Sequence, residues 1–479
     1  MLRITGNHDI PTLLVKLAAQ GIELLRTIRE SVEQHQRSFR PVAMRVNACC
    51  AVRIDIWAVE ILEVGEDAHA FGIELHSPDA IPPPARACND WVMDFELTAE
   101  QQAIRDTCRD FAREVVAPAA EELDREHKFG YDIVRQMGEL GLFGLPFSEE
   151  YGGAGADFLS LCLAIEEISR ADTGVGITLE AAVCLGAAPI HDFGTKEQKE
   201  RWLPDLLAGR KLWAFGLTEP EAGSDAGASK TRAEIRNGSW VVNGAKQFIT
   251  NSGTDISAGV TVTAVTGKVN GGRPEISAIM IPNGTPGYHV LASYRKLGWH
   301  SSDTHPLSFE DCAVPREYLL GMQGGGYRQF LHTLMGGRIA IAALSVGLAQ
   351  ACLDASLAYA KERQTFGVPI SKHQAIQFKL ADMAMETELA RTMVYRAAMA
   401  YMKEGANTTD DARMLAAMCK LYASETSKRA ADQAIQIHGG YGFIEDYPVA
   451  RYWRDVKINE IGEGTSEVQR MLIARLLGC

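Results

Sequence analysis

The residues best suited to chemistry lie near the C-terminus, where a glycine-rich segment precedes an isolated acid. Gln436, Gly439, Gly440 and Gly442 stand in QIHGGYGFIEDYPVARYWRD, and Glu463 lies between two glycines in IGEGTSEVQR. Glycine-rich helix ends commonly serve as C-caps, but bare backbone also lets a flat or charged molecule approach closely. A carboxylate in such a place can remove a proton from carbon only where water is excluded and the developing charge is stabilised. Without further context, Glu463 is an ordinary solvated acid at a helix end.

A second segment, GLTEPEAGSDAG at residues 216–227, combines small residues with the hydroxyl groups of Thr218 and Ser224. Its backbone N–H groups can face a ring edge or a pyrophosphate. Taken alone, it is equally well a turn between a helical region and a sheet. In this order and at this separation, the two segments resemble the two signatures of the acyl-CoA dehydrogenase family, and the resemblance covers roughly residues 93–479.

The resemblance implies a reaction and a base. Members of that family remove a proton from the carbon next to a thioester and a hydride from the following carbon. The product is a trans-2-enoyl-CoA, and FAD takes the hydride at its N5 atom. Glu463 stands at the position of the catalytic base. Relatives of the isovaleryl-CoA type carry the base immediately before the arginine that corresponds to Arg338, where this chain has Gly337, so Glu463 has no rival. Many medium-chain members have an Asp three residues before that arginine, whereas this chain has Met335. The expected substrate-binding residues are Ser224, Arg338 and Gly464.

The same resemblance implies where FAD would bind. Phe248 and Thr250 match an aromatic-x-Thr pattern whose ring packs on the flavin, and RQTFG at residues 363–367 matches a motif that reaches the FAD of a neighbouring subunit in relatives. The guanidinium of Arg363 suits a diphosphate, although an arginine that complements a helix dipole is the simpler alternative. No GxGxxG opens a βαβ unit, which excludes a Rossmann flavoprotein. The expected FAD-binding residues are Leu217, Thr218, Ser224, Phe248, Thr250, Arg363, Thr365, Phe366, His373, Gln374, Gln436, Gly439, Gly440, Thr465 and Glu467.

Composition and charge narrow the class of protein. The 479 residues carry a net charge of -13, which argues against nucleic acid and anionic lipid as main partners. The length predicts two or three domains. The ten cysteines form no CxxC pair, so we expect reduced thiols and no metal site. No apolar run approaches the roughly 18 residues that a membrane span needs, so no transmembrane helix is expected.

Residues 1–92 are expected to be an extension that is disordered or not native. The family resemblance begins at Met93 with MDFELTAEQQAIRD, and Pro82–Pro84 favour an extended linker before it. One alternative is an upstream start assignment with Met93 as the natural first residue, and another is a real but poorly ordered extension. A transit peptide is less favoured because the segment has 12 acidic against 9 basic residues.

The remaining chain is predicted to be α+β, with the acyl-CoA dehydrogenase-like fold. Its expected parts are an N-terminal α-helical domain (93–215), a middle β-barrel or sheet domain (216–325) and a C-terminal four-helix bundle domain (326–479). Helical spacing of apolar residues predicts the bundle helices at 327–361, 372–403, 409–437 and 448–477.

Two local signals support this division. Thr98 and Gln101 form a capping-box pattern ahead of the first helix. In the middle domain, Trp240–Val242 and Ala245–Thr250 flank Asn243-Gly244, which predicts a hairpin with a type I′ turn.

The resemblance also implies partners. The substrate would be an acyl-CoA, the electron acceptor an electron-transferring flavoprotein, and the assembly a homo-oligomer, with a tetramer as the expected form. The expected location is the bacterial-type cytoplasm, with the mitochondrial matrix as a minor alternative. The first alternative function is a flavin oxidase on the same fold, acyl-CoA or nitroalkane oxidase-like, although the nitroalkane type would carry Asp in place of Glu463. A DNA-binding protective relative is disfavoured by the net charge of -13.

The acyl group of the substrate is not readable from the chain. Gly176 stands where glutaryl-CoA-type members need an arginine, which disfavours a dicarboxylic substrate. Glu180 lies in TGVGITLEAA, where medium-chain members place a glutamate at the pocket floor, but the register differs by one residue before Pro189. Chain length and branching therefore stay open.

Overall fold

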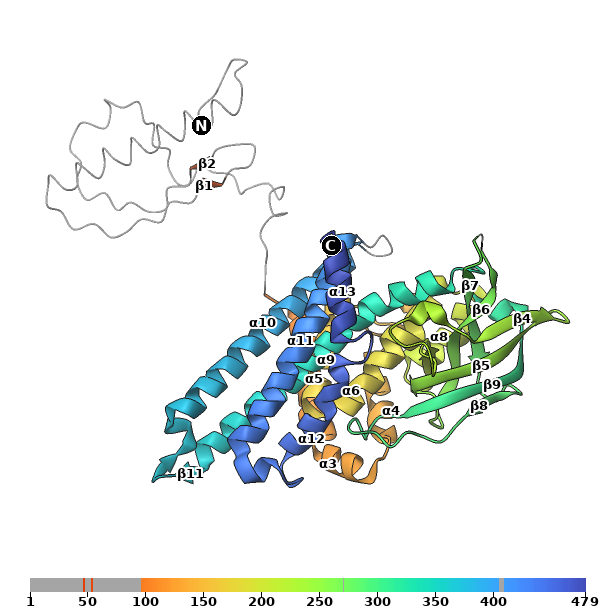
Figure 1. Cartoon of the computed structure of the whole chain (residues 1–479). Coiled ribbons are helices and arrows are strands. Elements are labelled where there is room, and N and C mark those ends of the chain that lie inside the picture. The colour runs from red at the N-terminus through yellow and green to blue at the C-terminus, as the bar shows by residue number, and fades with distance from the viewer. Residues whose placement is uncertain (1–45, 48–52, 55–95, 270, 405–408) are drawn as a thin grey trace, which may run out of the picture. The chain divides into compact units, whose positions relative to one another are not determined.

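The computed structural model of the chain describes residues 46–47, 53–54, 96–269, 271–404 and 409–479 (Figure 1). The chain divides into two units, Met1–Asp94 and Phe95–Cys479. In the first unit the described residues form two short antiparallel strands, β1 (Val46–Asn47) and β2 (Arg53–Ile54). The rest of the predicted N-terminal extension lies outside the described residues, so its disorder stays a prediction.

The second unit begins with helices, as predicted. The Thr98 hydroxyl accepts a hydrogen bond from the Gln101 amide at 3.2 Å, and the Gln101 side chain accepts one from the Thr98 amide at 2.9 Å. The predicted capping box is therefore confirmed. The helical segments of this part are α2 (Ala99–Phe111), η3 (Ala112–Val116), α3 (Ala117–Glu126), α4 (Tyr131–Glu139), η4 (Leu142–Gly144), η5 (Glu149–Tyr151), α5 (Phe158–Ala171), α6 (Thr173–Glu180), η6 (Ala181–Ala187), α7 (Ala188–Phe193) and α8 (Lys196–Leu207).

An eight-stranded sheet follows these helices. Its strand order is β10-β7-β6-β4-β5-β9-β8, and β3 pairs in parallel with β6. Trp240, Val262 and Phe309 belong to an apolar cluster that the sheet buries on its own. The elements of this part are β3 (Leu212–Gly216), η7 (Ala226–Ala228), β4 (Arg232–Arg236), β5 (Ser239–Thr250), β6 (Ser257–Lys268), β7 (Pro274–Pro282), β8 (Tyr288–Val290), β9 (Thr304–Pro315), η8 (Arg316–Tyr318) and β10 (Leu319–Leu320).

The predicted hairpin turn at Asn243-Gly244 is wrong. The turn between β4 and β5 is formed by Asn237 and Gly238, whose φ angles of 51° and 80° are those of a type I′ turn. Asn243 lies inside β5, at a register shift against β9, and its side-chain oxygen accepts a hydrogen bond from the Asp311 amide at 2.8 Å. Of the Asn-Gly pairs at 237–238 and 243–244, strand pairing makes a turn of the first and a bulge of the second.

The C-terminal part is a bundle of long helices, and one of its predicted helices is broken. The expected helix 448–477 is interrupted by residues 461–465, where Gly464 has a φ of 90° and Thr465 caps the next helix by accepting from the Val468 amide at 3.3 Å. The elements are α9 (Gly326–Glu362), β11 (Gln364–Thr365), β12 (Val368–Pro369), η9 (Ile370–Lys372), α10 (Gln374–Glu404), α11 (Asp410–His438), η10 (Gly439–Gly442), α12 (Pro448–Asp455), η11 (Val456–Glu460) and α13 (Ser466–Leu476).

Two helical stretches are more apolar than the sequence reading recognised. Thr173–Phe193 and Gly326–Glu362 are long and apolar enough to cross a membrane by length and composition alone. Their most apolar windows are 89 % and 78 % buried inside the protein. Burial in the core explains this composition, because a helix that is covered on all sides is apolar all round.

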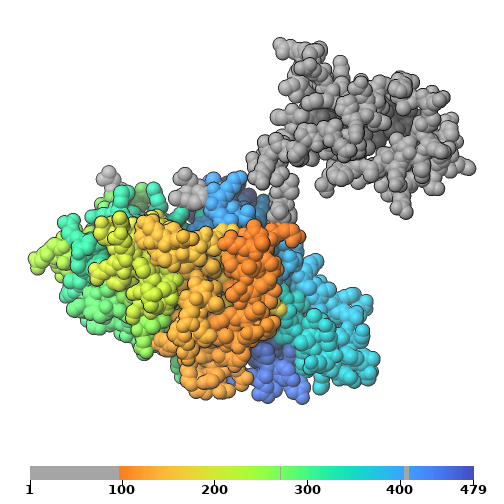
Figure 2. Space-filling view, turned by 180° about the vertical axis from the view of Figure 1, so that it is seen from behind, coloured from red at the N-terminus to blue at the C-terminus, as the bar shows by residue number. Residues whose placement is uncertain are grey.

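The N-terminal helices fill the space between the sheet and the bundle. Figure 2 shows them in orange and yellow, between the green strands and the blue helices of the C-terminal part. Residues of α5, η6 and α9 share one apolar core, including Leu163, Val183 and Ile341. We retain the predicted domain boundaries at residues 215 and 325 as a proposal.

Candidate active site

The helical regions and the sheet enclose a cavity of about 2570 Å³. Its walls come from α9, from η6, from β5 and from the turn before α13. Pockets for one drug-sized ligand usually measure about 300–1,000 Å³. The larger volume here suits two molecules side by side.

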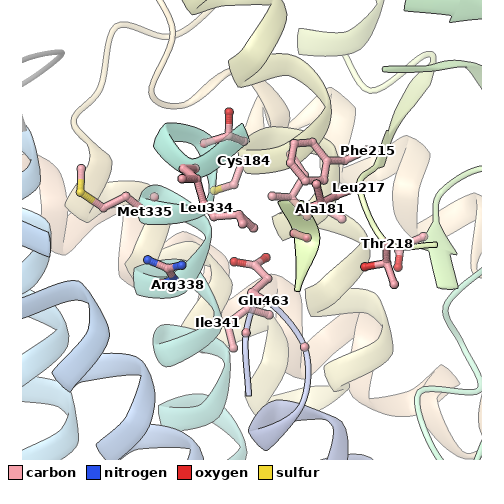
Figure 3. A pocket seen from close by; sticks show the side chains of 18 of the residues that line it. Ala181, Cys184, Phe215, Leu217, Thr218, Leu334, Met335, Arg338, Ile341 and Glu463 are labelled. Carbon is pink, nitrogen blue, oxygen red and sulfur yellow. The ribbon is translucent and has the colours of Figure 1, made fainter. Parts of the chain in front are cut away.

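Glu463 enters this cavity from the turn that separates η11 from α13 (Figure 3). Its φ of 54° is positive, and Gly464 follows with a φ of 90°. A glutamate in this region of φ is strained and needs support from its surroundings. The Lys420 ammonium and the Gln469 side-chain amide provide it, because each donates to the Gly464 carbonyl oxygen at 2.8 Å. Contacts from α11 and α13 therefore fix the turn.

The carboxyl group of Glu463 is buried without a donor. Within the described part of the chain, neither of its oxygens has a hydrogen-bond partner among amides, hydroxyls or cations. Burial raises its pKa to about 7, while the contact with Glu180 and the positive charges of Lys420 and Arg338 act in the opposite direction. A carboxylate with a pKa near neutrality is well matched to proton transfer at physiological pH.

Two buried cations face this carboxylate. Arg338 on α9 lies beside Glu463 (Figure 3), is 9 % exposed, and has an Nε without a partner among the described residues. Burial lowers the pKa of Arg338, and the charge of Glu463 opposes that shift. Lys420 is fully buried, and burial lowers its pKa to about 8. Both charges favour the ionised form of Glu463, and Arg338 keeps a donor free for a ligand.

Gly337 provides the room for the carboxylate. The space that a side chain at this position would fill is occupied by the carboxyl group of Glu463. Residue 337, where isovaleryl-CoA-type relatives are expected to carry the base, thus leaves its space to the carboxyl group of Glu463.

The large cavity brings together many of the predicted site residues. Phe248 has a positive φ of 60° and is 64 % exposed, and its ring centroid lies 5.2 Å from that of Tyr294. An apolar ring left this open in a cavity has a free face, which fits a flat aromatic cofactor. The predicted residues that line this cavity are Leu217, Thr218, Ser224, Phe248, Thr250, Arg338, Glu463, Gly464 and Thr465.

A second pocket, of about 530 Å³, collects another group. Its lining includes Arg363, Thr365, Gly439 and Gly440. The Thr365 hydroxyl and His373 Nε2 lie 3.0 Å apart beside it. Four further residues of the predicted FAD-binding set line neither pocket and are exposed: Phe366, Gln374, Gln436 and Glu467.

A buried ion pair supports the cavity wall, and the sequence reading missed it. The Lys246 ammonium on β5 donates to Glu219 at 2.7 Å, to the Leu217 carbonyl oxygen at 3.1 Å and to the Thr263 hydroxyl at 3.0 Å. Burial lowers the pKa of Lys246 to about 8. Burial would raise the pKa of Glu219, but Lys246 and several hydrogen bonds lower it to about 2. The sequence signal that could have revealed this ion pair was a lysine, Lys246, within an otherwise apolar strand.

Comparison with known proteins identifies the class. Family models match three successive parts of the chain: the acyl-CoA dehydrogenase N-terminal domain at 98–210, the middle domain at 214–312 and the C-terminal domain at 324–478. The chain therefore belongs to the acyl-CoA dehydrogenase family, and the predicted family is confirmed. It is 52 % identical over 385 residues to a probable acyl-CoA dehydrogenase of Bacillus subtilis. The aligned residues make up 80 % of this chain and 100 % of that relative.

Solved structures confirm the predicted fold. Butyryl-CoA dehydrogenase of Megasphaera elsdenii has a TM-score of 0.77 and 42 % identity, covering 81 % of this chain and 100 % of that chain. A structure from work on the electron transferring flavoprotein of Acidaminococcus fermentans has a TM-score of 0.77 and 45 % identity, covering 80 % and 99 %. An acyl-CoA dehydrogenase from Bacillus anthracis, complexed with FAD, has a TM-score of 0.74 and 35 % identity, covering 80 % and 67 %. The family is FAD-dependent, so the predicted cofactor is confirmed, and the open ring of Phe248 fits it.

Proposed function

We propose that Glu463 is the base of an acyl-CoA α,β-dehydrogenation in this chain. Glu463 removes the proton from the carbon next to the thioester carbonyl, and the product is the trans-2-enoyl-CoA. Bound FAD supplies the acceptor for the hydride that leaves the next carbon. The observation that carries the proposal is a buried carboxylate with a pKa of about 7, held in a cavity without a donor of its own.

The neighbours of Glu463 prepare it for this step. The α-proton of a thioester is a weak acid, so the base must be ionised, dry and close to a group that stabilises the enolate oxygen. Arg338 and Lys420 favour the ionised carboxylate. We assign the backbone N–H of Glu463 to the thioester oxygen, because the adjoining Gly464 leaves the backbone open there. The proposed substrate contacts are Ser224, Arg338 and Gly464.

The FAD-binding residues are proposed in two groups. Those in the large cavity would hold the flavin, with Phe248 against the ring and Thr218 and Thr250 as hydroxyl donors. Those around Arg363 would reach the FAD of a neighbouring subunit, and their separate pocket supports this division. Such an arrangement requires a homo-oligomer, and we propose a tetramer.

The relatives suggest the substrate class and the electron acceptor. The butyryl-CoA dehydrogenase relative favours a short-chain acyl-CoA, and the relative from work on an electron transferring flavoprotein favours that acceptor. A bacterial relative at 52 % identity supports the cytoplasm as the location. The acidic net charge of -13 continues to disfavour a DNA-binding role.

An anaerobic titration of the FAD-loaded protein tests this proposal. Butyryl-CoA should bleach the flavin faster than long-chain or branched acyl-CoAs do, and Glu463→Gln should keep the FAD content but slow bleaching by several orders of magnitude. Glu121→Gln, an exposed acid on α3, is the control. Bleaching at close to the normal rate in Glu463→Gln would show that the base lies elsewhere. Rapid reoxidation of the reduced protein by oxygen alone would favour an oxidase.

A further inference from the structure

The ring of Phe248, which the proposed function places against the flavin, stands on a strained point of β5. Gln247 and Phe248 lie at a register shift of β5 against β9, and Phe248 has a φ of 60°. A bulge of this kind turns a side chain out of the strand, and a bulky residue with a positive φ needs support from its neighbours. Phe248 is nevertheless 64 % exposed, so its own strand provides little of that support.

The support comes from Tyr294, in the segment between β8 and β9. The ring centroids of Phe248 and Tyr294 lie 5.2 Å apart, and their planes are inclined by 37°. Aromatic rings at this separation attract each other beyond the area that they bury. The Tyr294 hydroxyl donates a hydrogen bond to the side-chain oxygen of Gln247, the residue before Phe248. Tyr294 thus holds both the ring of Phe248 and the side chain next to it.

The segment that carries Tyr294 is itself fixed. The Tyr294 amide donates to the Thr304 carbonyl oxygen at 3.2 Å, which ties the segment to the start of β9. Five residues further on, the Trp299 amide donates to the buried carboxyl group of Asp455 at 2.6 Å, which ties it to α12. A side chain can orient another ring only if its own position is fixed. These two hydrogen bonds give Tyr294 such a position.

Both rings lie in the wall of the large cavity. Gln247, Phe248, Tyr294 and Thr218 all line it. The Gln247 amide donates to the Thr218 carbonyl oxygen at 2.9 Å, so the contact between Tyr294 and Gln247 reaches the segment with the proposed flavin contacts. Tyr294 is half-buried, whereas Phe248 is exposed. Phe248 therefore presents its ring to a bound molecule, and Tyr294 packs beside that ring.

We propose that Tyr294 is a positioning residue for the cofactor, which fixes the ring of Phe248 in the orientation that stacks on FAD. This inference depends on the proposed role of Phe248 in FAD binding. An exposed ring that is already held in its binding orientation loses less conformational freedom when the ligand binds. The attraction within an aromatic pair corresponds to roughly a 2- to 12-fold change in an equilibrium constant. Here that contribution acts on the affinity for FAD through Phe248.

The release of FAD from the diluted holoenzyme, followed by the rise in flavin fluorescence, tests the proposal. Tyr294→Leu should raise the FAD dissociation constant by roughly 2- to 12-fold, and Tyr294→Phe, which keeps the ring, should raise it less. Because Tyr294 acts through Phe248, the double variant Phe248→Leu/Tyr294→Leu should match Phe248→Leu alone. The matched control is Tyr131→Leu, which should keep the wild-type constant. Tyr131 pairs with Phe129 at a centroid distance of 4.9 Å and lines neither pocket.

A second readout is the visible circular dichroism of the bound flavin, which reports the packing around its ring. It should change in Tyr294→Leu and in Phe248→Leu and stay the same in Tyr131→Leu. A wild-type dissociation constant in Tyr294→Leu, or losses that add up in the double variant, would overturn the inference. If Phe248→Leu itself keeps the wild-type constant, the proposed flavin site fails. If Phe248→Leu loses affinity for FAD and Tyr294→Leu does not, only this inference fails.

Discussion

Gly337 and Glu463 adjoin so closely that a Cβ atom on residue 337 would lie 2.2 Å from Oε2 of Glu463. The two residues are 126 positions apart in the chain (463 minus 337), Gly337 on α9 and Glu463 in the turn before α13. A side chain on α9 at this point and the present position of the carboxylate exclude each other. The bare backbone of Gly337 is therefore a condition for Glu463 to stand where it does.

Gly337→Ala is expected to slow flavin reduction by about 100-fold, because the added methyl group displaces the Glu463 carboxylate by about 1 Å or more. FAD content should not change. The matched control is Gly336→Ala on the same helix, where the nearest atom to the new Cβ would be the Tyr401 hydroxyl at 3.2 Å. Stopped-flow bleaching with butyryl-CoA measures both variants. Equal rates in the two variants would contradict the crowding argument.

Lys246→Met is expected to lower the free energy of unfolding by about 3–5 kcal/mol, because it leaves the Glu219 carboxylate buried without its cation. It also removes the donor to the Leu217 carbonyl oxygen, so FAD retention should fall. Lys230→Met is the control, since Lys230 pairs with Glu221 on the surface and should cost no more than about 0.5 kcal/mol. Thermal unfolding and flavin content after gel filtration report both effects. Wild-type values for Lys246→Met would mean that the pair has no supporting role.

Arg363→Ala is expected to weaken FAD retention and subunit assembly together, because the proposed guanidinium–diphosphate contact crosses a subunit boundary. Excess FAD should partly restore the oligomer by mass action. Lys361→Ala removes a charge from the last turn of the same helix and should change neither property. Sedimentation with and without added FAD distinguishes the outcomes. A normal oligomer with normal flavin content in Arg363→Ala would leave the residue as a simple helix-end charge.

Asp455 is expected to contribute to the free energy of unfolding, and this contribution should decline as the pH rises from about 4 to about 6. Burial raises its pKa to about 6, so between these values the folded state binds a proton that the unfolded state has lost. The contribution is complete below the unfolded pKa and is lost through the folded pKa, a change of about 3 kcal/mol. Asp455→Asn should remove this decline, whereas the exposed Asp446→Asn should keep it. Melting temperatures measured from pH 4 to pH 7 compare the three proteins, and parallel curves for Asp455→Asn and the wild type would contradict the expectation.

Local patterns in the sequence predicted most of the fold. The capping box at Thr98 and the long bundle helices depend on contacts within a few residues, so apolar spacing and caps were sufficient to find them. The hairpin was misplaced because Asn237-Gly238 and Asn243-Gly244 carry the same local preference. Only the pairing of β5 with both β4 and β9 decides which pair turns the chain.

The sequence by itself determined the family, the cofactor and the position of Glu463 between two glycines, since these follow from residue types in a fixed order. It did not determine the break before α13, because the apolar spacing continues across it. The tertiary structure decided the chemistry of the carboxylate. Gly337 and Lys420 lie far from Glu463 in the chain, yet they supply its space and an opposing charge. A pKa depends on solvation and on the charges within a few ångströms, and folding alone brings those groups together.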